Sequence, residues 1–386
     1  MVDFPSYQAA LEWLFAQTRG GAPRHVARMR ALLEKLALPS PPSVVHVVGT
    51  NGKGSVSAML AAAYSAAGRR TGRFISPHVV DFRERIAVNE VWITETEVLD
   101  FIRSLPELEL APAFFELTLA LALRHFARES VEIAVIEAGV GARRDATRAL
   151  GNVRAVVITN VGRDHLETLG PSVRDIARDK AEAIRPDVPT LTGASGEALE
   201  VIREVAAARR SPLYTPASPL FDIPSACPPA TPTVRQNQAL AAATLRLQGV
   251  PETAIRQGLS RALPARVERF RVGGREIILD GAHNPAAAAA LLEQLKRPFT
   301  LLFGALPKKL GAETLHVLAP HAGDVIITQI GLEPPPLRAG HTFVADPEAA
   351  LNEALCRGGA QLAITGSFYL AGRLRPRLIT LANARR

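Results

Sequence analysis

The chain has 386 residues, of which 47% are hydrophobic and 21% charged, a balance that is ordinary for a globular protein and leaves room for two domains. Its formal net charge is +8, but the basic residues are spread along the sequence and aromatic residues make up only 5%. These features exclude a typical nucleic-acid-binding protein and favour small polyanionic substrates.

Targeting features are also missing from the sequence. No apolar run reaches the roughly 18 residues of a membrane span, and the N-terminal sequence lacks a signal-peptide layout. The two cysteines, Cys227 and Cys356, lie outside any CxxC pattern. We therefore expect free thiols in a reducing cytoplasm and no membrane partner. A monomer is a separate expectation that none of these features tests.

Short β-branched runs alternate with stretches rich in alanine and leucine over the first two thirds of the chain. Continuous apolar strands separated by helices indicate a mostly parallel sheet that helices cover on both faces. A proline-rich segment, 211–232, is predicted to be a loop or insert. The predicted strands are 44–49, 132–139 and 155–162, and the predicted helices are 55–68, 114–129 and 236–247.

A second α/β series follows, with predicted strands at 275–283, 299–306, 324–330 and 362–367. The predicted fold class is therefore α/β: an N-terminal P-loop domain over residues 1–263 and a smaller, Rossmann-like C-terminal domain over residues 264–386.

The segment VVHVVGTNGKGS, residues 44–55, places a glycine-rich turn between a strand and a helix. It departs from the usual P-loop pattern, because Val47 stands at the first glycine position and Gly54 separates the lysine from the serine. Glycines allow the backbone to approach a ligand, and N–H groups at the helix start attract phosphate. A plain tight turn is the alternative, but it would not need Lys53. We interpret the segment as a phosphate-binding loop.

Four further residues have more than one interpretation. Glu137 directly follows a predicted strand, where α/β sheets bind ligands, but it can also be a solvated carboxylate. His165 is either a ligand or a helix-start histidine, and Asp164 before it either orients its ring or caps the helix. Lys180 lies in a helical pattern and by itself resembles a surface lysine in an ion pair.

Several motifs together resemble the folylpolyglutamate synthase/dihydrofolate synthase family of Mur-type ATP-dependent amide ligases, over roughly residues 40–370. GTNGKGS is that family's normal loop, and the pattern SPHxxxxxERIxxN points to its folate branch. The motifs are TGRFISPHVVDFRERIAVN, FFE, IEAGVGARRDAT, ITNVGRDHLETLG, IARDKAEAIRP, RQNQALAAATL, PARVERF, LDGAHNP and TGSFYL.

The resemblance implies a Mur-ligase-like central domain, a glutamate-ligase domain and a role in folate biosynthesis. ATP would phosphorylate the carboxylate of dihydropteroate or a folate, and the amine of L-glutamate would then displace phosphate. Mg²⁺, at one or two sites, and cationic side chains would offset the repulsion between the two anions.

The resemblance also assigns roles to residues. Lys53, Lys180 and His283 would be catalytic, with Lys180 N6-carboxylated, and Ser76, Glu137 and His165 would bind the metal. Asp280 would contact the ribose of ATP and Arg266 its phosphates. The ATP-binding residues would be Gly49, Thr50, Asn51, Gly52, Lys53, Gly54, Ser55, Asn237, Arg266 and Asp280. The substrate-binding residues would be Ala113, Phe114, Phe115, Glu116, Arg144, Asp145, Ala146, Ser367 and Tyr369.

Each substrate-binding assignment has a plainer alternative. The phenylalanines can be core residues, and Arg144 with Asp145 can be a surface ion pair. His283, Ser367 and Tyr369 can be polar residues at strand ends. The sequence also departs from the family pattern at Ala113, Ala142, Arg148, Glu182 and the segment GALPKKL. These departures leave the acceptor open between dihydropteroate and a reduced folate.

Two rival functions remain. UDP-muramoyl amino-acid ligases carry a separate UDP-binding domain before the loop, whereas only about 48 residues precede it here, so a folate enzyme is favoured. A nucleotide-gated binding module without ligase activity would not require the set of Glu137, His165 and Lys180.

Overall fold

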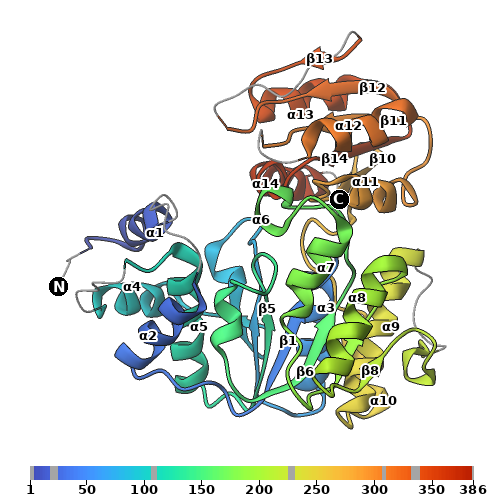
Figure 1. The fold of residues 1–386 in the computed structure, drawn as a ribbon. Coiled ribbons are helices and arrows are strands. Elements are labelled where there is room, and N and C mark those ends of the chain that lie inside the picture. Colours follow the sequence, from blue (N-terminus) through green and yellow to red (C-terminus); the bar gives the residue numbers. More distant parts are fainter. Residues whose placement is uncertain are drawn as a thin grey trace. The chain divides into compact units, whose positions relative to one another are not determined.

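The computed structural model describes residues 4–17, 25–105, 111–224, 231–306, 310–331 and 340–384. The chain forms two compact units (Figure 1). The first unit comprises Met1–Ser76, Arg83–Gly162 and Leu166–Arg261, and the second comprises Pro77–Phe82, Arg163–His165 and Ala262–Arg386. The functional division between residues 263 and 264 stays a prediction.

The first unit is built on an eight-stranded sheet with the order β4-β3-β2-β5-β1-β6-β7-β8. The strands from β2 to β8 in this order run parallel, and β3 and β4 are added antiparallel at one edge. The mostly parallel sheet is confirmed. The strands are β1 (Val44–Val48), β2 (Thr71–Phe74), β3 (Ile86–Val88), β4 (Val91–Trp92), β5 (Ile133–Glu137), β6 (Val153–Ile158), β7 (Thr190–Thr192) and β8 (Leu213–Tyr214).

Helices cover both faces of this sheet because its central strands are apolar on both sides. Val45 and Val47 of β1 pack toward α3, α9 and α10, whereas Val48 packs toward α7 and α8. The helices are α1 (Tyr7–Ala16), α2 (Val26–Lys35), α3 (Lys53–Ala66), α4 (Glu95–Arg103), α5 (Phe114–Arg128), α6 (Leu166–Leu169), α7 (Val173–Ala181), α8 (Gly196–Ala208), α9 (Pro232–Leu247) and α10 (Glu252–Leu259).

One predicted loop is partly wrong. Within the proline-rich segment 211–232, residues Leu213–Tyr214 form the edge strand β8 and pair in parallel with β7. The pairing uses backbone groups, so side-chain composition did not indicate it. Residues 225–230 of this segment, with Cys227, lie outside the described residues, while Cys356 is a free and exposed cysteine.

The second unit contains a six-stranded sheet with the order β13-β12-β11-β14-β10-β9, parallel except for β9. Helices α13 and α14 cover one face, and α11 and α12 cover the other. The elements are β9 (Glu268–Val272), β10 (Arg275–Leu279), α11 (Pro285–Leu292), β11 (Phe299–Phe303), α12 (Gly311–Leu318), β12 (Ala322–Ile327), β13 (Thr342–Phe343), α13 (Pro347–Cys356), β14 (Gln361–Thr365) and α14 (Phe368–Asn383).

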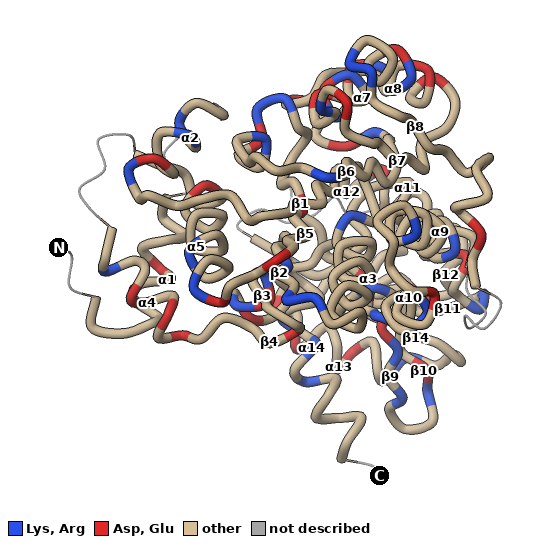
Figure 2. The backbone as a smooth tube through the Cα atoms, turned by 90° about the horizontal axis from the view of Figure 1, so that it is seen from below, with Lys and Arg blue, Asp and Glu red and all other residues tan. Residues whose placement is uncertain are grey.

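Charge is distributed along the whole chain. Figure 2 shows basic and acidic positions interspersed over most elements, as the composition predicts. Among the residues that the structure describes, no helix is both long and apolar enough to cross a membrane.

Candidate active site

The segment between β1 and α3 is a loop that only glycine can form at two positions. Gly49 has φ 151°, and a Cβ there would lie 1.9 Å from Thr159 Oγ1. Gly52 has φ 82°, and a Cβ there would lie 2.4 Å from Asn237 Oδ1. The first turn of α3 then begins at Lys53 and includes Gly54 and Ser55. A strand, a glycine-dependent turn and a helix N-terminus form a phosphate-binding arrangement.

The loop is anchored by residues that follow β6. The Asn51 N–H donates to Asn160 Oδ1 at 2.9 Å, and the Thr159 hydroxyl donates to the Asn51 carbonyl at 2.6 Å. Thr50 Oγ1 lies 3.0 Å from the N–H of Gly162, which donates to it. Sequence reasoning assigned no role to Thr159 or Asn160, although their place at the end of a buried strand is the signal that could have found them.

Two lysines converge on one backbone carbonyl of this loop. Lys53 Nζ donates to the carbonyl oxygens of Gly49 and Thr50, each at 3.1 Å. Lys180 Nζ in α7 donates to the same Gly49 carbonyl at 2.8 Å. Lys180 is only 3% exposed, so the surface-lysine interpretation is wrong. Two ammonium groups beside a helix N-terminus concentrate positive charge where a polyphosphate would lie.

Glu137 lies at the same edge of the sheet. It ends β5 and pairs in register with Val47, two residues before Gly49. Its carboxylate is buried, and Glu137 Oε2 accepts a hydrogen bond from the Ser76 N–H at 3.1 Å. The solvated-carboxylate interpretation is therefore wrong. The predicted metal residues Ser76 and Glu137 are brought together in the first unit.

The third predicted metal residue, His165, belongs to the second unit and has a left-handed backbone with φ 50°. Within the described ranges, no three His, Cys, Asp or Glu side chains are grouped as a metal site. A buried carboxylate beside a phosphate loop nevertheless fits Mg²⁺, which commonly takes one or two carboxylates and completes its shell with water and phosphate oxygens.

The residues at the start of α5 have mixed surroundings. Phe115 packs 5.5 Å from the Phe74 ring, and Phe114 stacks at 5.2 Å on Phe15 with the Arg85 guanidinium 5.1 Å from its centroid. Aromatic rings therefore gather around the start of α5.

The predicted residue Glu116 is buried and already bonded. The single N–H of Arg28 Nε donates a bifurcated hydrogen bond to the two oxygens of Glu116, at 2.8 and 3.0 Å, and the Ala113 N–H donates to the same carboxylate at 2.8 Å. Glu116 therefore fixes the first turn of α5. Arg144 is exposed and Ala146 is buried. Asp145 is also buried, which excludes a surface ion pair between Arg144 and Asp145.

In the second unit, Asp280 follows β10 and is held by backbone groups. Its two oxygens accept hydrogen bonds from the N–H groups of Val267 and Ala282, both at 2.8 Å. Burial raises the pKa of Asp280, against the opposing effects of Arg266 and these N–H donors. The Arg266 guanidinium lies 4.2 Å from the centroid of the Phe368 ring.

His283 and Asp164 belong to the second unit as well. His283 Nδ1 lies 2.9 Å from the Gly281 carbonyl, and its Nε2 lies 3.7 Å from Asp164 Oδ2. The Asn284 amide donates to the same Asp164 oxygen at 3.2 Å, while Asp164 Oδ1 accepts from the His165 N–H. Asp164 therefore joins the segment of His165 to the turn of His283.

Ser367 and Tyr369, the other two residues predicted to bind substrate in this unit, lie at the start of α14. The Ser367 hydroxyl donates to the Gly304 carbonyl at 2.8 Å and accepts from the Leu370 N–H, so it caps the helix. Tyr369 is 66% exposed.

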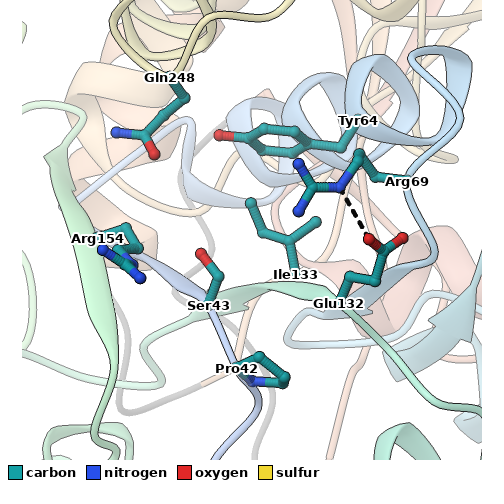
Figure 3. Close-up of a pocket in the computed structure, with 8 residues that line it drawn as sticks. All are labelled: Pro42, Ser43, Tyr64, Arg69, Glu132, Ile133, Arg154 and Gln248. Carbon is teal, nitrogen blue, oxygen red and sulfur yellow. Dashed lines mark hydrogen bonds and ion pairs between the residues drawn. The ribbon is translucent and has the colours of Figure 1, made fainter.

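A cavity of about 450 Å³ lies at the opposite end of the first unit's strands (Figure 3). Ser43, Glu132 and Arg154 line it near the amino-terminal ends of β1, β5 and β6. Ligands of parallel α/β sheets bind at the carboxyl ends of the strands, so this cavity is separate from the candidate site.

Comparisons with known proteins agree with this architecture. Residues 47–186 match the Mur ligase middle domain, and residues 265–368 match the Mur ligase glutamate ligase domain. A dihydrofolate synthase/folylpolyglutamate synthase of Bacillus subtilis is 31% identical over 350 residues, which cover 79% of this chain and 81% of the relative.

Solved structures give the same answer. An Escherichia coli FolC in complex with DHPP and ADP has a TM-score of 0.84 at 26% identity and covers 97% of this chain and 98% of its own. A Yersinia pestis bifunctional folylpolyglutamate synthase/dihydrofolate synthase complexed with AMPPNP and Mn ion has a TM-score of 0.83 at 25% identity with the same coverage. The chain belongs to the dihydrofolate synthase/folylpolyglutamate synthase family of Mur ligases.

Proposed function

We propose that the protein is an ATP-dependent ligase that joins L-glutamate to the carboxylate of dihydropteroate, of a reduced folate, or of both. The observation that carries this proposal is the convergence of Lys53 and Lys180 on the Gly49 carbonyl, at the sheet edge where Glu137 ends β5. Binding a nucleotide needs the loop and one lysine, whereas activating a carboxylate needs further groups at the transferred phosphate.

The loop would bind the phosphates of ATP through the N–H groups at the start of α3. Lys53 would move from the carbonyls of Gly49 and Thr50 to the β- and γ-phosphates, because a phosphate oxygen carries more negative charge than a carbonyl. We assign the whole predicted set to nucleotide binding: Gly49, Thr50, Asn51, Gly52, Lys53, Gly54, Ser55, Asn237, Arg266 and Asp280.

Glu137, Ser76 and His165 would hold Mg²⁺, which when bound would neutralise phosphate charge. The acceptor carboxylate would form a bond to the γ-phosphorus as ADP leaves. The glutamate amine would then attack the acyl carbon and release phosphate, with His283 placed to assist at the glutamate side. The ammonium group of Lys53 would stabilise the negative charge on the transferred phosphate in both steps.

Lys180 is proposed to be N6-carboxylated in the working enzyme. Its burial and its contact with the phosphate loop support this role, since a carbamate there would project a carboxylate-like group toward bound cations.

The acceptor would lie between the aromatic rings of Phe114 and Phe115, with the exposed Arg144 available for its anionic tail. Ala113, Glu116, Asp145 and Ala146 complete the proposed acceptor site, and Ser367 and Tyr369 the glutamate site. Because the hydroxyl of Ser367 and the carboxylate of Glu116 are already bonded, we propose that they shape these sites through the helix starts that they stabilise.

A phosphate-release assay tests the function. ATP, Mg²⁺ and L-glutamate are supplied with dihydropteroate, with a reduced folate monoglutamate, or with a UDP-muramoyl peptide precursor. Release that depends on both glutamate and a pteridine supports the proposal. Release only with the UDP compound would identify another Mur-type ligase, and no release with tight ATP binding would identify a non-catalytic module. The monomeric state and cytoplasmic location stay predictions.

A further inference from the structure

A buried chain of hydrogen bonds runs through the first unit from the centre of β1 to the segment that follows Glu137. It begins at His46, continues through Thr147 and reaches Asp145, and these three side chains are each no more than 2% exposed. His46 Nε2 lies 2.8 Å from Thr147 Oγ1, and the Thr147 hydroxyl donates to Asp145 Oδ1 at 2.6 Å. None of these contacts involves a residue assigned to ATP or metal.

The direction of these hydrogen bonds follows from their chemistry. Thr147 has one hydroxyl proton, and its 2.6 Å contact to a carboxylate uses it. Thr147 Oγ1 must then accept from His46, which therefore carries its proton on Nε2. Burial, with Arg185 adding to it, lowers the pKa of His46 to about 3, so the ring is neutral. Within the described residues, His46 Nδ1 has no hydrogen-bond partner.

At the other end of this series of hydrogen bonds, Asp145 holds backbone groups of the segment after β5. Asp145 Oδ2 accepts from the N–H groups of Gly139 and Val140, both at 3.0 Å. A Cβ at Gly139 would lie 3.0 Å from the Phe115 ring and 3.2 Å from Asp145 Oδ2. Gly139 therefore fits closely between the carboxylate and an aromatic ring of the proposed acceptor site. Its N–H group comes two residues after Glu137.

We infer that His46, Thr147 and Asp145 are positioning residues that fix the segment after β5 and thereby aim the Glu137 carboxylate at the metal. The Asp145 carboxylate accepts four hydrogen bonds from the chain itself, two from Thr147 and one each from Gly139 and Val140. Asp145 also belongs to the proposed acceptor site, which it would shape through this backbone segment. This inference rests on the proposed role of Glu137. Replacing a group that orients a metal ligand typically lowers metal affinity or activity by about 10- to 100-fold.

The test uses Thr147→Val, which keeps the shape of the side chain and removes the hydroxyl. Amide hydrogen exchange of the peptide containing Gly139 and Val140 should become faster, because their acceptor is less firmly held. The affinity for Mn²⁺ in the presence of a non-hydrolysable ATP analogue should fall about tenfold. The electron paramagnetic resonance signal of free Mn²⁺ measures this affinity. Thr147→Ser should restore both.

Thr190→Val is the matched control. Thr190 lies in β7 of the first unit and is also buried, and its hydroxyl forms a 2.9 Å hydrogen bond with the hydroxyl of Ser211. It should change neither the exchange of the 139–140 peptide nor Mn²⁺ binding. If Thr147→Val does not fold, Asp145→Asn provides the second variant, since its amide cannot accept the same hydrogen bonds at both oxygen positions.

Unchanged exchange at 139–140 in Thr147→Val would overturn the inference. Faster exchange with unchanged Mn²⁺ affinity would overturn it as well, because the segment would then be held without affecting Glu137. Neither measurement needs ligase turnover. A failure of the proposed function would therefore be seen separately: the wild-type protein would bind Mn²⁺ and nucleotide but release no phosphate with any pteridine.

Discussion

The ammonium group of Lys180 donates a 2.8 Å hydrogen bond to the carbonyl of Gly49, 131 residues earlier in the chain. This contact ties helix α7 to the loop after β1, at which we propose that the transferred phosphate binds. Lys180→Ala should therefore lose most of the ligation activity, by about 100-fold or more, as expected when a charged group at the transferred phosphate is removed. Steady-state phosphate release measures the loss.

The carboxylation of Lys180 makes a further prediction. If a carbamate is needed, Lys180→Arg should be inactive although it keeps the positive charge. Formate or acetate should partly restore Lys180→Ala by occupying the vacated position, and neither should help Lys180→Arg. Full activity of the arginine variant would return this residue to a purely cationic role.

Gly52→Ala should impair nucleotide binding. The positive φ of 82° costs an alanine about 1–2 kcal/mol, and its Cβ would approach Asn237 Oδ1 within 2.4 Å. Calorimetric titration with ADP and Mg²⁺ should show clearly weakened affinity. Wild-type affinity in Gly52→Ala would show that the loop tolerates a side chain.

Asp280→Ala should raise the KM for ATP more than the KM for glutamate, because Asp280 is proposed to contact the ribose. Its carboxylate also accepts the N–H groups of Val267 and Ala282. Asp280→Asn should disturb the backbone around this residue less than Asp280→Ala, since it keeps one oxygen acceptor. Separate titrations of the two substrates measure the effect. A rise in the glutamate KM alone would place Asp280 at the other substrate.

The buried His46 predicts a loss of stability in acid. Its pKa falls from 6.5 to about 3 on folding. Between these two values, His46 binds a proton in the unfolded chain but stays neutral in the folded chain. The free energy of unfolding should therefore decrease as the pH falls from 6.5 toward 3, with a contribution from this group of at most about 1.4 kcal/mol per pH unit.

His46→Gln should give a shallower decrease, because glutamine does not titrate. Urea unfolding at several pH values between 4 and 7 compares the two proteins. An equal slope in both would mean that other groups determine the acid sensitivity.

The elements that the sequence predicted correctly are those with a strong local pattern. The continuous apolar runs of β1 and β5 indicated buried parallel strands, and the glycines between β1 and α3 indicated a glycine-dependent turn. The edge strand β8 was missed because a two-residue strand is defined by backbone pairing and leaves no periodic pattern.

The contacts within the site depend on long-range packing and were therefore harder to predict. Helical periodicity placed Lys180 on the surface, whereas tertiary packing buries it beside Gly49. The contact of Asn160 with Asn51 joins segments 109 residues apart. The chain from His46 through Thr147 to Asp145 likewise required the fold, since no local pattern distinguishes a polar residue in an apolar strand from one that is merely tolerated there.

The most direct test of the proposed reaction follows one oxygen atom. Dihydropteroate, or the pteridine acceptor found active in the phosphate-release assay, is labelled with ¹⁸O in its carboxylate and incubated with ATP, Mg²⁺ and L-glutamate. An acyl phosphate intermediate requires that a carboxylate oxygen leave with the phosphate, so mass spectrometry should find the label in the released phosphate. Phosphate that forms with glutamylated product but carries no label would contradict an acyl phosphate route.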